Sequence, residues 1–424
     1  MIRPKSGGKL HLFFYWLLFA ILFFSIGLFV LSFFSSTGWN IYHGVYFFIL
    51  LAYTWLIAIL LFIGEIKKDD FPMYAGEKIA VIIPAYNEDP ELLVKSLRSV
   101  LNCNGNKDIF LIDDGSIKGI DKKKLLDGCK KFGIKPYFFR VNKGKRHALH
   151  FAVSQLLEDH EFVVTIDSDT VLDKDALIRL VEPLKDPSVG ASTGDVFLLN
   201  EKENMLTRMI GAYYWVGLNI YKRAQSAIGM VVCCSGCLAA YRADVAKDII
   251  EEFVNQKFLG EDCTHSEDRH LTNLVLRSGL KVKFTDKAKS YTHTPSTISG
   301  FLKQQQRWKR GFIRESTYTL TYAWRINPLL FFQILLCELT VPFFAFGLML
   351  GLILSIIIKP IFFVKVVLPS WIIFMFVRYV YILFYGKRKI PGLFFYMFFY
   401  EIFLYWQFIY ALFTVKNKSW ITRG

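Results

Sequence analysis

The sequence predicts an α/β domain with a doubly wound, mostly parallel sheet, inserted between transmembrane helices at the two ends of the chain. Hydrophobic residues make up 53% of the 424 residues, which exceeds the usual share for a soluble domain. The apolar runs lie at both ends, and the middle is charged. Within that middle, short β-rich runs alternate with helix-length stretches, an order typical of a parallel sheet.

Residues 1–66 are predicted to form a pair of transmembrane helices. Leu12–Phe34 and Val45–Ile63 carry no charged residue, and each is long enough to cross a hydrocarbon core as a helix. The first run is too long for a cleavable signal peptide and is expected to stay as an anchor. Basic residues flank the pair and are absent from its connecting loop, so both flanks are expected in the cytoplasm: Arg3, Lys5, Lys9, Lys67 and Lys68.

Residues 67–300 are predicted to form the cytoplasmic α/β domain. "KIAVIIPAY", "DIFLIDD" and "EFVVTIDSDT" are buried-strand runs that each end in polar residues, and residues 90–101 and 146–157 between them are helix-length stretches. Open parallel sheets bind ligands beyond the carboxyl ends of their strands. The polar residues at these ends are therefore the first candidates for a site.

The C-terminal part is predicted to return to the membrane. Residues 301–328 form an amphipathic interface helix with the sequence "QQQRW", and three apolar blocks follow at 329–358, 361–385 and 392–415. The first two blocks are expected to cross as a hairpin. The third contains Glu401 and starts just after Pro391, so it is expected to lie at the interface or to re-enter rather than to cross. Residues 416–424 are expected to form a last segment in the cytoplasm. Because of the apolar runs at both ends, the protein is expected in the plasma membrane.

The formal net charge of +15 does not indicate a nucleic-acid partner. The Lys and Arg residues are spread over the membrane flanks and the polar domain, and no recognition-helix or stacking motif accompanies them. Membrane anchoring and an anionic small substrate explain the excess better. The seven cysteines are an odd number and lie mostly in the expected cytoplasmic part, so disulfides are not expected.

"IDSDT" places Asp167 and Asp169 two residues apart at the end of an apolar run. In an extended chain, residues two apart point to the same side, so both carboxylates can address one divalent cation and a diphosphate that it bridges. Alone, this pattern is also compatible with a solvated strand end. Its significance comes from three further polar turns in the same predicted sheet.

Those turns are "PAYNED" (84–89), "IDDGS" (112–116) and "NKGKRHA" (142–148). The acceptors of Asp113 and Asp114 suit a uracil ring or ribose hydroxyls. Lys143, Lys145 and Arg146 stand beside a glycine at the start of a predicted helix, a combination that suits a phosphate. Four such turns at strand ends favour a nucleotide site.

Taken in order, "PAYNED", "DDGS", "NKGKRHA", "DSDT", "SEDRHLTN" and "QQQRW" resemble the processive membrane glycosyltransferases of family 2. Within that family, class I hyaluronan synthases and rhizobial chito-oligosaccharide (chitin) synthases are the most similar. The resemblance covers nearly the whole chain. It implies a GT-A fold and an inverting transferase that polymerises a GlcNAc-containing polysaccharide from UDP-sugars and extrudes it through its own membrane channel.

The resemblance also implies roles for individual residues. Asp167 and Asp169 correspond to the metal-binding motif that holds Mg²⁺ or Mn²⁺ on the UDP diphosphate, and Asp268 corresponds to the general base. Glu267 and Arg269 flank that base and are included with it as catalytic candidates. The residues implied in binding the nucleotide, sugar or acceptor are Tyr86, Glu88, Asp114, Lys145, Gln304, Arg307, Trp308, Trp420 and Arg423.

The chemistry of the "EDR" cluster supports the implied base. Transfer to a sugar hydroxyl needs a proton acceptor near that hydroxyl, and the departing UDP needs its charge neutralised. An aspartate is ionised at neutral pH and can take the proton. By like-charge repulsion Glu267 is expected to raise the pKa of Asp268, and Arg269 to lower it. A structural ion pair is the alternative for this cluster.

"VCCSGCLAAYR" (232–242) has two interpretations. Cys234 and Cys237, with Cys263 and His265, could supply four zinc ligands, although their spacing is irregular. The family interpretation is a Ser-Gly-Pro element that lines the acceptor end, in which Cys237 replaces the proline.

The product is predicted from features that point in different directions. "SEDR" is nearer to the Gly-Glu-Asp-Arg of chito-oligosaccharide synthases, whereas "LTN", "FIRES" and the ending "LFTVKNKSWITR" resemble bacterial hyaluronan synthase. Hyaluronan from UDP-GlcNAc and UDP-GlcA is favoured, and a polymer from UDP-GlcNAc alone is the alternative. The carboxylate of GlcA would need a cation, for which Lys143, Arg146, Lys309 and Arg310 are candidates. A catalytically inactive polysaccharide channel and a non-processive transferase to a lipid phosphate are further alternatives.

Overall fold

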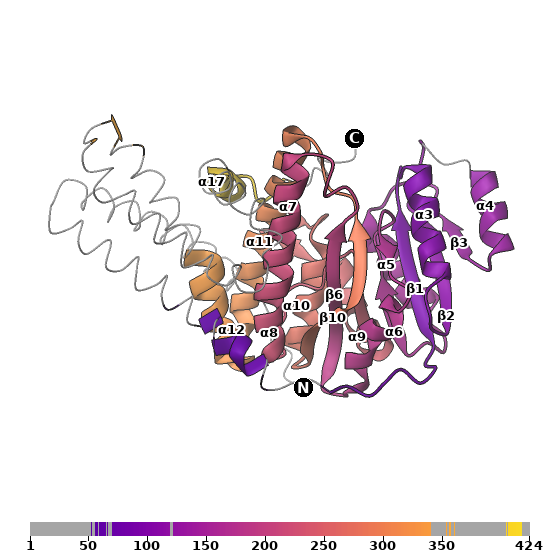
Figure 1. The fold of residues 1–424 in the computed structure, drawn as a ribbon, viewed down its shortest axis with the longest axis horizontal. Coiled ribbons are helices and arrows are strands. Elements are labelled where there is room, and N and C mark those ends of the chain that lie inside the picture. Colours follow the sequence, from indigo (N-terminus) through magenta and orange to yellow (C-terminus); the bar gives the residue numbers. More distant parts are fainter. Residues whose placement is uncertain are drawn as a thin grey trace. The chain divides into compact units, whose positions relative to one another are not determined.

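The computed structural model describes residues 70–118, 122–340 and 406–417, together with isolated positions between 52 and 66 and between 353 and 404. These residues fall into two compact units. The sheet unit comprises Leu60–Lys257 and Asp262–Phe301, and the helical unit contains Phe258–Glu261 and the described residues of Leu302–Asn417. Figure 1 shows the elements of both.

The sheet unit is built on eight strands in the order β3-β2-β1-β4-β7-β6-β10-β5. The pairs β2–β3, β1–β2, β1–β4 and β6–β10 are parallel, and β4–β7, β6–β7 and β5–β10 are antiparallel. The strands are β1 (Ile79–Ala85), β2 (Lys107–Asp113), β3 (Lys135–Phe138), β4 (Phe162–Thr165), β5 (Val171–Leu172), β6 (Val189–Leu198), β7 (Ala239–Arg242) and β10 (Lys281–Thr292). A separate pair is formed by β8 (Lys257–Phe258) and β9 (Glu261–Asp262).

Helices cover both faces of this sheet (Figure 1). On one face, α3 and α6 share a hydrophobic core with the strands. On the other, α5, α9 and α10 pack together and against the sheet. The helices of this unit are α3 (Pro90–Leu101), α4 (Lys122–Lys131), α5 (Lys145–Gln155), α6 (Ala176–Val181), the 3₁₀ helix η1 (Glu182–Lys185), α7 (Met205–Val216), the π-helix η2 (Gly217–Lys222), α8 (Arg223–Ala227), α9 (Ala243–Val254) and α10 (Glu267–Arg277).

The central strand β1 has an uninterrupted apolar sequence because of its place in the sheet. All seven of its residues are buried, since both faces of the strand are covered. Burying an aliphatic side chain of this size contributes roughly 1.5–3 kcal/mol, so the packing of β1 stabilises the middle of the sheet. Its neighbours β2 and β4 run parallel to it, and the three therefore end at the same edge.

The strand and helix predictions for residues 67–300 agree with the structure. The three predicted strand runs contain or overlap β1, β2 and β4, and the two predicted helices match or overlap α3 and α5. Asp89 caps α3 by accepting the backbone N–H groups of Glu91 and Leu92, and Pro90 follows at its first position. This capping turn follows directly on the candidate residues Tyr86 and Glu88.

The described part of the helical unit consists of α11 (Ile298–Ile326) from Leu302 onward, α12 (Pro328–Gln333), the π-helix η3 (Ile334–Thr340) and α17 (Trp406–Phe413). No helix among the described residues has both the length and the apolar character needed to cross a membrane. The predicted spans at 12–34, 45–63 and 361–385 lie largely or wholly outside the described residues. About half of the residues in the predicted blocks at 329–358 and 392–415 also lie outside them.

Helix α11 is more deeply packed than an interface helix would be. Lys309 Nζ donates to Leu404 O at 2.9 Å and to Gln407 Oε1 at 3.3 Å. Arg310 Nε donates to Thr414 Oγ1 at 3.1 Å. Both cations are buried, and burial lowers the pKa of Lys309 to about 7. The expectation that Lys309 or Arg310 binds the carboxylate of GlcA is therefore wrong, because backbone and side-chain acceptors of α17 and its surroundings already hold them.

Candidate functional site

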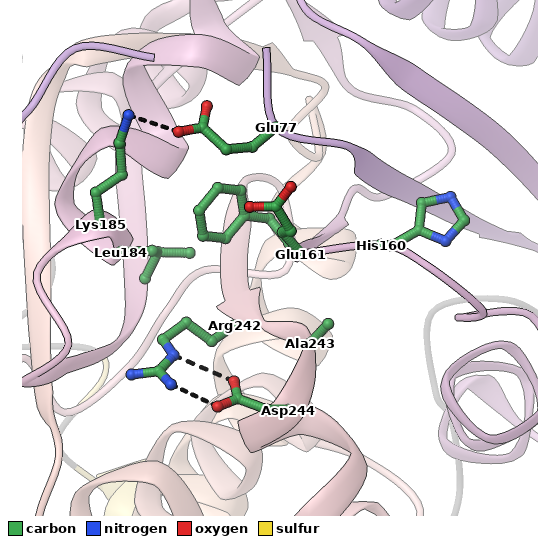
Figure 2. Close-up of a pocket in the computed structure, with 9 residues that line it drawn as sticks. Glu77, His160, Glu161, Leu184, Lys185, Arg242, Ala243 and Asp244 are labelled. Atoms are coloured by element: carbon green, nitrogen blue, oxygen red, sulfur yellow. Dashed lines mark hydrogen bonds and ion pairs between the residues drawn. The ribbon is translucent and has the colours of Figure 1, made fainter. Parts of the chain in front are cut away.

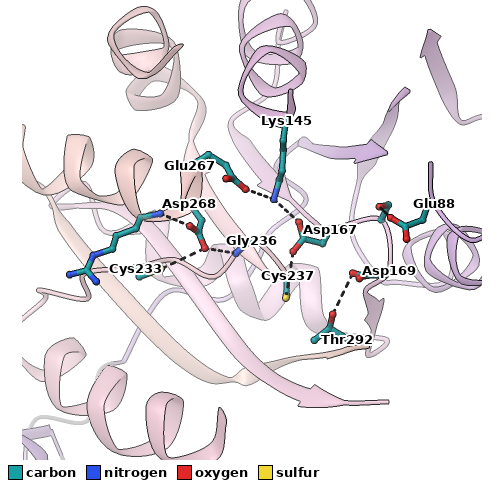
Figure 3. A network of polar contacts seen from close by, with 12 residues as sticks. Glu88, Lys145, Asp167, Asp169, Cys233, Gly236, Cys237, Glu267, Asp268 and Thr292 are labelled. Atoms are coloured by element: carbon teal, nitrogen blue, oxygen red, sulfur yellow. Dashed lines mark hydrogen bonds and ion pairs between the residues drawn. The ribbon is translucent and has the colours of Figure 1, made fainter. Parts of the chain in front are cut away.

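The site is built on the loops that follow β1, β2 and β4, with further residues from the β6–β7 connection and from the start of α10. Figure 3 shows the polar network that joins these segments. All of its residues belong to the sheet unit.

The loops after β1 and β2 are held together by hydrogen bonds from backbone N–H groups to side chains. Asn87 N–H donates to Ser116 Oγ at 2.8 Å, and Asn87 Oδ1 accepts the N–H of Ile117 at 2.9 Å. A Cβ on Gly115, which has a φ of +76°, would lie 2.6 Å from the carbonyl carbon of Val141. Only glycine allows this approach, so "DDGS" brings the 141–144 loop against the nucleotide candidates.

Asp114 organises the "NKGKR" turn. Its Oδ1 accepts the N–H of Lys143 at 2.8 Å, and its Oδ2 accepts the N–H of Gly144 at 2.7 Å. Burial raises the pKa of Asp114, and these two N–H groups partly oppose that shift. Since a carboxylate offers about four acceptor positions, Asp114 retains capacity for a ligand donor after making both bonds.

Arg146 and Lys143, two cations of that turn, lie in different surroundings. Arg146 is buried and donates to Phe253 O at 3.0 Å and to Gln256 Oε1 at 2.6 Å. The predicted role of Arg146 at a phosphate, or at the carboxylate of GlcA, is therefore wrong, because the guanidinium joins α5 to the end of α9. Lys143 is exposed beside Asp114.

Lys145 is the centre of the network. Its Nζ lies 2.5 Å from Asp167 Oδ1 and 2.9 Å from Glu267 Oε1. One ammonium thus joins the "DSDT" loop to the first turn of α10, two segments about 100 residues apart in the chain. Although burial opposes its charge, the two carboxylates raise the pKa of Lys145, so it is a cation at any physiological pH.

The "DSDT" residues form a turn and not an extended segment. Strand β4 ends at Thr165, and Thr170 N–H donates to Asp167 O at 3.0 Å. The predicted extended conformation of these residues is therefore wrong, although both carboxylates still lie near Cys237. Asp167 Oδ2 lies 3.6 Å from Cys237 Sγ, and Asp169 Oδ1 accepts from Thr292 Oγ1 at 3.4 Å.

Glu88 closes the other side of this loop. Its Oε2 accepts from Ser168 Oγ at 2.5 Å, and the side chain is buried. Tyr86 is partly buried in the same loop after β1. Glu88 therefore positions the residue between the two candidate metal ligands, a contact that the sequence did not predict.

Asp268 occupies the first turn of α10, after Ser266 in the left-handed conformation. Its Oδ1 accepts the N–H of Arg269 at 2.8 Å, and its Oδ2 accepts the N–H of Gly236 at 3.3 Å. Cys233 Sγ lies 3.7 Å from the same Oδ2. The carboxylate is thus held in one orientation between α10 and the "CCSGC" loop.

The two adjacent carboxylates of α10 have opposite pKa shifts. Burial would raise the pKa of Glu267, but the charge of Lys145 and its hydrogen bond hold it at about 2. Burial, followed by the negative charge of Glu267, raises the pKa of Asp268. The predicted repulsion from Glu267 is therefore present, as the second cause of the raised pKa of Asp268 after burial. Arg269 acts on Asp268 through its backbone N–H, which lowers the pKa.

A pH-rate profile tests this assignment. A base whose pKa is raised loses activity as the pH falls through that pKa, because protonated Asp268 cannot accept a proton. Glu267→Gln removes a negative charge that raises the pKa of Asp268. We expect the acid limb of kcat/KM to move to lower pH in this variant. An acid limb that stays in place or moves to higher pH would contradict the assignment.

Gly236 is required by the close packing of this centre. A Cβ at this position would lie 2.9 Å from Lys145 Nζ and 3.2 Å from Asp167 Oδ2. We expect Gly236→Ala to lower kcat/KM by about tenfold to a hundredfold, since displacing reacting groups by ~1 Å has effects of this size. Gly128→Ala is the matched control, because nothing lies within 4 Å of the added Cβ. Equal rates for the two variants would show that the spacing is not critical.

Two residues near the site were not predicted. Burial, with contributions from charges that include Asp169 and Asp167, raises the pKa of Tyr214 well above its usual range. Lys222 Nζ donates to Ser235 Oγ at 2.6 Å. Both lie in the continuous helical segment α7–η2, and no periodic or motif signal in the sequence distinguishes them from packing residues.

Five further predicted residues come from other segments of the chain. Gln304, Arg307 and Trp308 lie on α11 in the helical unit, where each is partly buried. Trp420 and Arg423 lie outside the described residues. Among the residues that the structure describes, no group of three or more His, Cys, Asp or Glu side chains is arranged to hold a metal by itself, the Cys234–Cys237–Cys263–His265 set included.

A separate pocket lies at the opposite edge of the sheet. It has a volume of about 440 Å³ and includes Glu77, which precedes β1, and Glu161, which precedes β4. Figure 2 shows that its cations are already paired with carboxylates: Lys185 with Glu77, and Arg242 with Asp244. Since the motif residues follow the other ends of these strands, this pocket is not the candidate site.

Comparison with known proteins identifies the family. The model of the glycosyltransferase-like family 2 matches residues 76–311, which include every residue of the network in Figure 3. The chain belongs to glycosyltransferase family 2. It is therefore a glycosyltransferase, as the order of the motifs predicted.

This glycosyltransferase is similar in sequence to several named proteins. An N-acetylglucosaminyltransferase of Azorhizobium caulinodans is 31% identical over 278 residues, which are 64% of this chain and 68% of the relative. A hyaluronan synthase of Streptococcus pyogenes is 35% identical over 281 residues, which are 64% of this chain and 65% of the relative. An N-acetylglucosaminyltransferase of Mesorhizobium japonicum is 34% identical, and the match spans 56% of each chain. The match thus spans between about half and two-thirds of these relatives.

A solved structure supports the fold. The mannosyltransferase of Pyrobaculum calidifontis, in complex with GDP-Man and Mn²⁺, aligns with a TM-score of 0.58 at 17% identity, covering 88% of this chain and 95% of that one. At this identity the similarity concerns the fold alone. With the mixed, largely parallel sheet it confirms that the glycosyltransferase has a GT-A-like α/β fold.

Proposed function

We propose that this glycosyltransferase is processive and inverting, and that it polymerises a GlcNAc-containing polysaccharide from UDP-sugars, with hyaluronan from UDP-GlcNAc and UDP-GlcA as the favoured product. The observation that carries the proposal is the bridge of Lys145 between Asp167 and Glu267, with Asp268 beside it. It brings the metal and base candidates into one place. The named relatives support the donor, since they are N-acetylglucosaminyltransferases and a hyaluronan synthase.

In this mechanism Asp268 removes the proton from the acceptor hydroxyl as that oxygen attacks the anomeric carbon. Its raised pKa suits a base, since a more basic carboxylate accepts the proton more readily. The N–H of Gly236 and the N–H of Arg269 hold the carboxylate in place. Attack from the side opposite to the departing UDP inverts the anomeric centre.

The residues around "DSDT" fit a divalent cation. Asp167 and Asp169 supply hard oxygen ligands of the kind that Mg²⁺ and Mn²⁺ prefer, and Mg²⁺ commonly takes only one or two carboxylates together with substrate phosphates. Asp167, Glu267 and Asp268 also give the cluster more negative charge than Lys145 neutralises. Asp167 and Asp169 would hold the ion, which would neutralise charge on the diphosphate of the departing UDP.

The Lys145 ammonium has a second role in this proposal. It separates the carboxylate that serves the metal from the one beside the base, and so limits repulsion within the cluster. Tyr86, Glu88 and Asp114 are proposed to bind the uridine. Gln304, Arg307 and Trp308 are proposed to act on the acceptor and diphosphate, as the family resemblance implies. Trp420 and Arg423 are proposed to close over the bound nucleotide.

We further propose that the protein is a multi-pass protein of the plasma membrane, with a cytoplasmic catalytic domain, and that it extrudes its product. The uncharged runs at 12–34 and 45–63 and the apolar blocks after residue 328 support this. Resistance to carbonate extraction, with protease access to residues 67–300 only from the cytoplasmic side, is the expected result. Release by carbonate would contradict it.

The alternative product is a chitin-type polymer from UDP-GlcNAc alone. It is favoured by "SEDR" and by the rhizobial relatives. An inactive polysaccharide channel is the alternative of another class. The intact set of carboxylates in the site argues against it.

Mass analysis of the product separates these functions. Purified protein would be incubated with Mn²⁺ and UDP-GlcNAc, with and without UDP-GlcA. The proposal predicts a long polymer with alternating masses only when both donors are present. A GlcNAc homopolymer would establish the alternative product, single transfer would exclude processivity, and absence of UDP release would favour the inactive channel.

A further inference from the structure

Lys222 is a partly buried cation that lacks a carboxylate partner. It ends the π-helix η2, and its Nζ donates to the hydroxyl of Ser235 at 2.6 Å. Among the described residues, no acidic side chain lies within ion-pair distance of this ammonium. An ammonium has three donors, and a neutral hydroxyl uses one of them. Its neighbour Arg223, by contrast, is paired with Asp286 at 2.6 Å.

The position of Lys222 is fixed relative to the proposed base. Ser235 precedes Gly236, whose N–H donates to Asp268 Oδ2 at 3.3 Å. Cys233, two residues before Ser235, contacts the same oxygen. The charge of Lys222 also acts on the thiols of Cys233 and Cys234, whose pKa values burial raises and this charge lowers. Lys222 is therefore hydrogen-bonded to the loop that holds Asp268, whereas Lys145 contacts the metal candidate Asp167.

The local helix geometry supports a role at the site. The six residues of η2 form a π-helical turn between α7 and α8, and such turns are frequent at functional sites. From this turn the amide of Asn219 reaches the buried Asp195 at 3.4 Å, and Lys222 reaches Ser235. Two polar side chains of the π-helix thus reach other segments of the sheet unit.

Other cations that could receive an acidic sugar are engaged. Arg146 is bound to the end of α9, and Lys309 and Arg310 are buried in the helical unit. Lys143 lies beside Asp114, in the loop proposed to bind the nucleotide. Of the cations considered for an acidic sugar, Lys222 is the one that combines proximity to the base with unused donors.

We propose that Lys222 binds the carboxylate of an acidic sugar at the end of the acceptor chain and so determines specificity for uronate-ending acceptors. This inference rests on the proposed function. An ammonium and a carboxylate form charge-assisted hydrogen bonds, and partial burial strengthens them. The contact would hold the terminal sugar with its attacking hydroxyl next to Asp268. A neutral sugar would leave the ammonium with only Ser235.

The test compares two acceptors that differ only at C6. Phenyl β-D-glucuronide carries a carboxylate and phenyl β-D-glucoside a hydroxymethyl group, and the full chain in detergent would transfer GlcNAc from UDP-GlcNAc to each. We expect a KM for the glucuronide at least about tenfold below that for the glucoside, the size typical of a hydrogen bond to a charged group. Lys222→Met should raise the KM for the glucuronide to that for the glucoside, and Lys222→Arg should keep part of the preference.

Arg223→Met is the matched control, because it removes an adjacent cation that already has a protein partner. It should retain the preference. UDP affinity, measured for each variant, reports whether the site still folds. The proposal is overturned if the wild-type protein has no preference for the glucuronide, if Lys222→Met keeps it, or if that variant loses both acceptors equally.

The failure of the proposed function would look different. In that case the wild-type protein transfers GlcNAc to neither acceptor and makes no polymer. Direct binding of phenyl β-D-glucuronide, measured by saturation-transfer NMR on the wild-type protein and on Lys222→Met, then decides the inference independently. Binding that is equal in the two proteins overturns it.

Discussion

Asp268→Asn is expected to abolish sugar transfer while UDP binding remains within about twofold of the wild-type value. Removing a general base typically costs ~10²–10⁴-fold in rate, and the amide cannot accept the acceptor proton. The amide oxygen can still accept the N–H of Arg269, whereas the bond from the N–H of Gly236 to the other oxygen is lost. The N–H of Cys234 still donates to Thr272 Oγ1 at 2.8 Å, so the loop and helix should keep their positions. UDP release in the presence of Mn²⁺ and UDP-GlcNAc, together with UDP affinity by calorimetry, measures both parts.

The matched control is Asp244→Asn, which changes a carboxylate at the opposite edge of the sheet. It should leave transfer unchanged. Normal turnover by Asp268→Asn would remove the base assignment. Loss of UDP binding together with turnover would show instead that Asp268 supports the donor site.

Lys145→Met is expected to have the second large effect, on both stability and transfer. It leaves Glu267 and Asp167 without the cation that joins them. Both partners of the pair with Glu267 are largely buried, at 17% and 8% side-chain exposure. Removing one partner of a buried pair costs about 3–5 kcal/mol. We expect the unfolding free energy to fall by an amount near the lower end of this range, because the carboxyl group of Glu267 can take up a proton.

The pH dependence of stability gives the sign of this effect. In the wild-type protein Lys145 holds the pKa of Glu267 at about 2, below its ordinary value of 4.5. That contribution is present above pH ~4.5 and is lost as the pH falls toward 2. Without Lys145, burial raises this pKa, so the variant should gain stability relative to wild type as the pH is lowered from 8 to 5.

Thermal unfolding across this pH range measures the prediction. The double variant with Lys145→Met and Glu267→Gln should recover most of the lost stability, since no buried charge remains at position 267. It should not recover transfer. Equal unfolding temperatures for Lys145→Met and the wild-type protein at pH 8 would show that the bridge does not stabilise the fold.

The sequence predicts the strand ends well because burial on both faces leaves a clear pattern. Strand β1 is apolar throughout and ends at "PAYNED", and β2 ends at "DDGS". Parallel pairing brings their carboxyl ends to one edge. Asp114 and Glu88 could therefore be assigned to a common site without coordinates.

The "DSDT" residues reach the predicted place for a different reason. The alternation of an extended strand was expected to direct Asp167 and Asp169 together. In the structure, β4 ends two residues earlier, and the loop is held by Ser168 on Glu88 and by Lys145 on Asp167. Side-chain contacts between distant segments, which a local pattern does not contain, determine this geometry.

Helix α7–η2 and helix α11 show where a sequence pattern is least informative. Lys222 and Tyr214 lie in a stretch without motif or charge pattern. Their importance depends on the contact of Lys222 with "CCSGC" and on the charges of "DSDT" that act on Tyr214. Conversely, Lys309 and Arg310 look like surface cations but are buried against acceptors from the last described helix and its surroundings. Tertiary packing decides both cases.

The most direct test of the central claim is a structure of the full chain carrying Asp268→Asn with UDP-GlcNAc and Mn²⁺ bound. The account predicts the metal and diphosphate at Asp167 and Asp169, with the anomeric carbon of GlcNAc facing position 268. A nucleotide in the pocket of Lys185 and Arg242, or a sugar directed away from position 268, would contradict it.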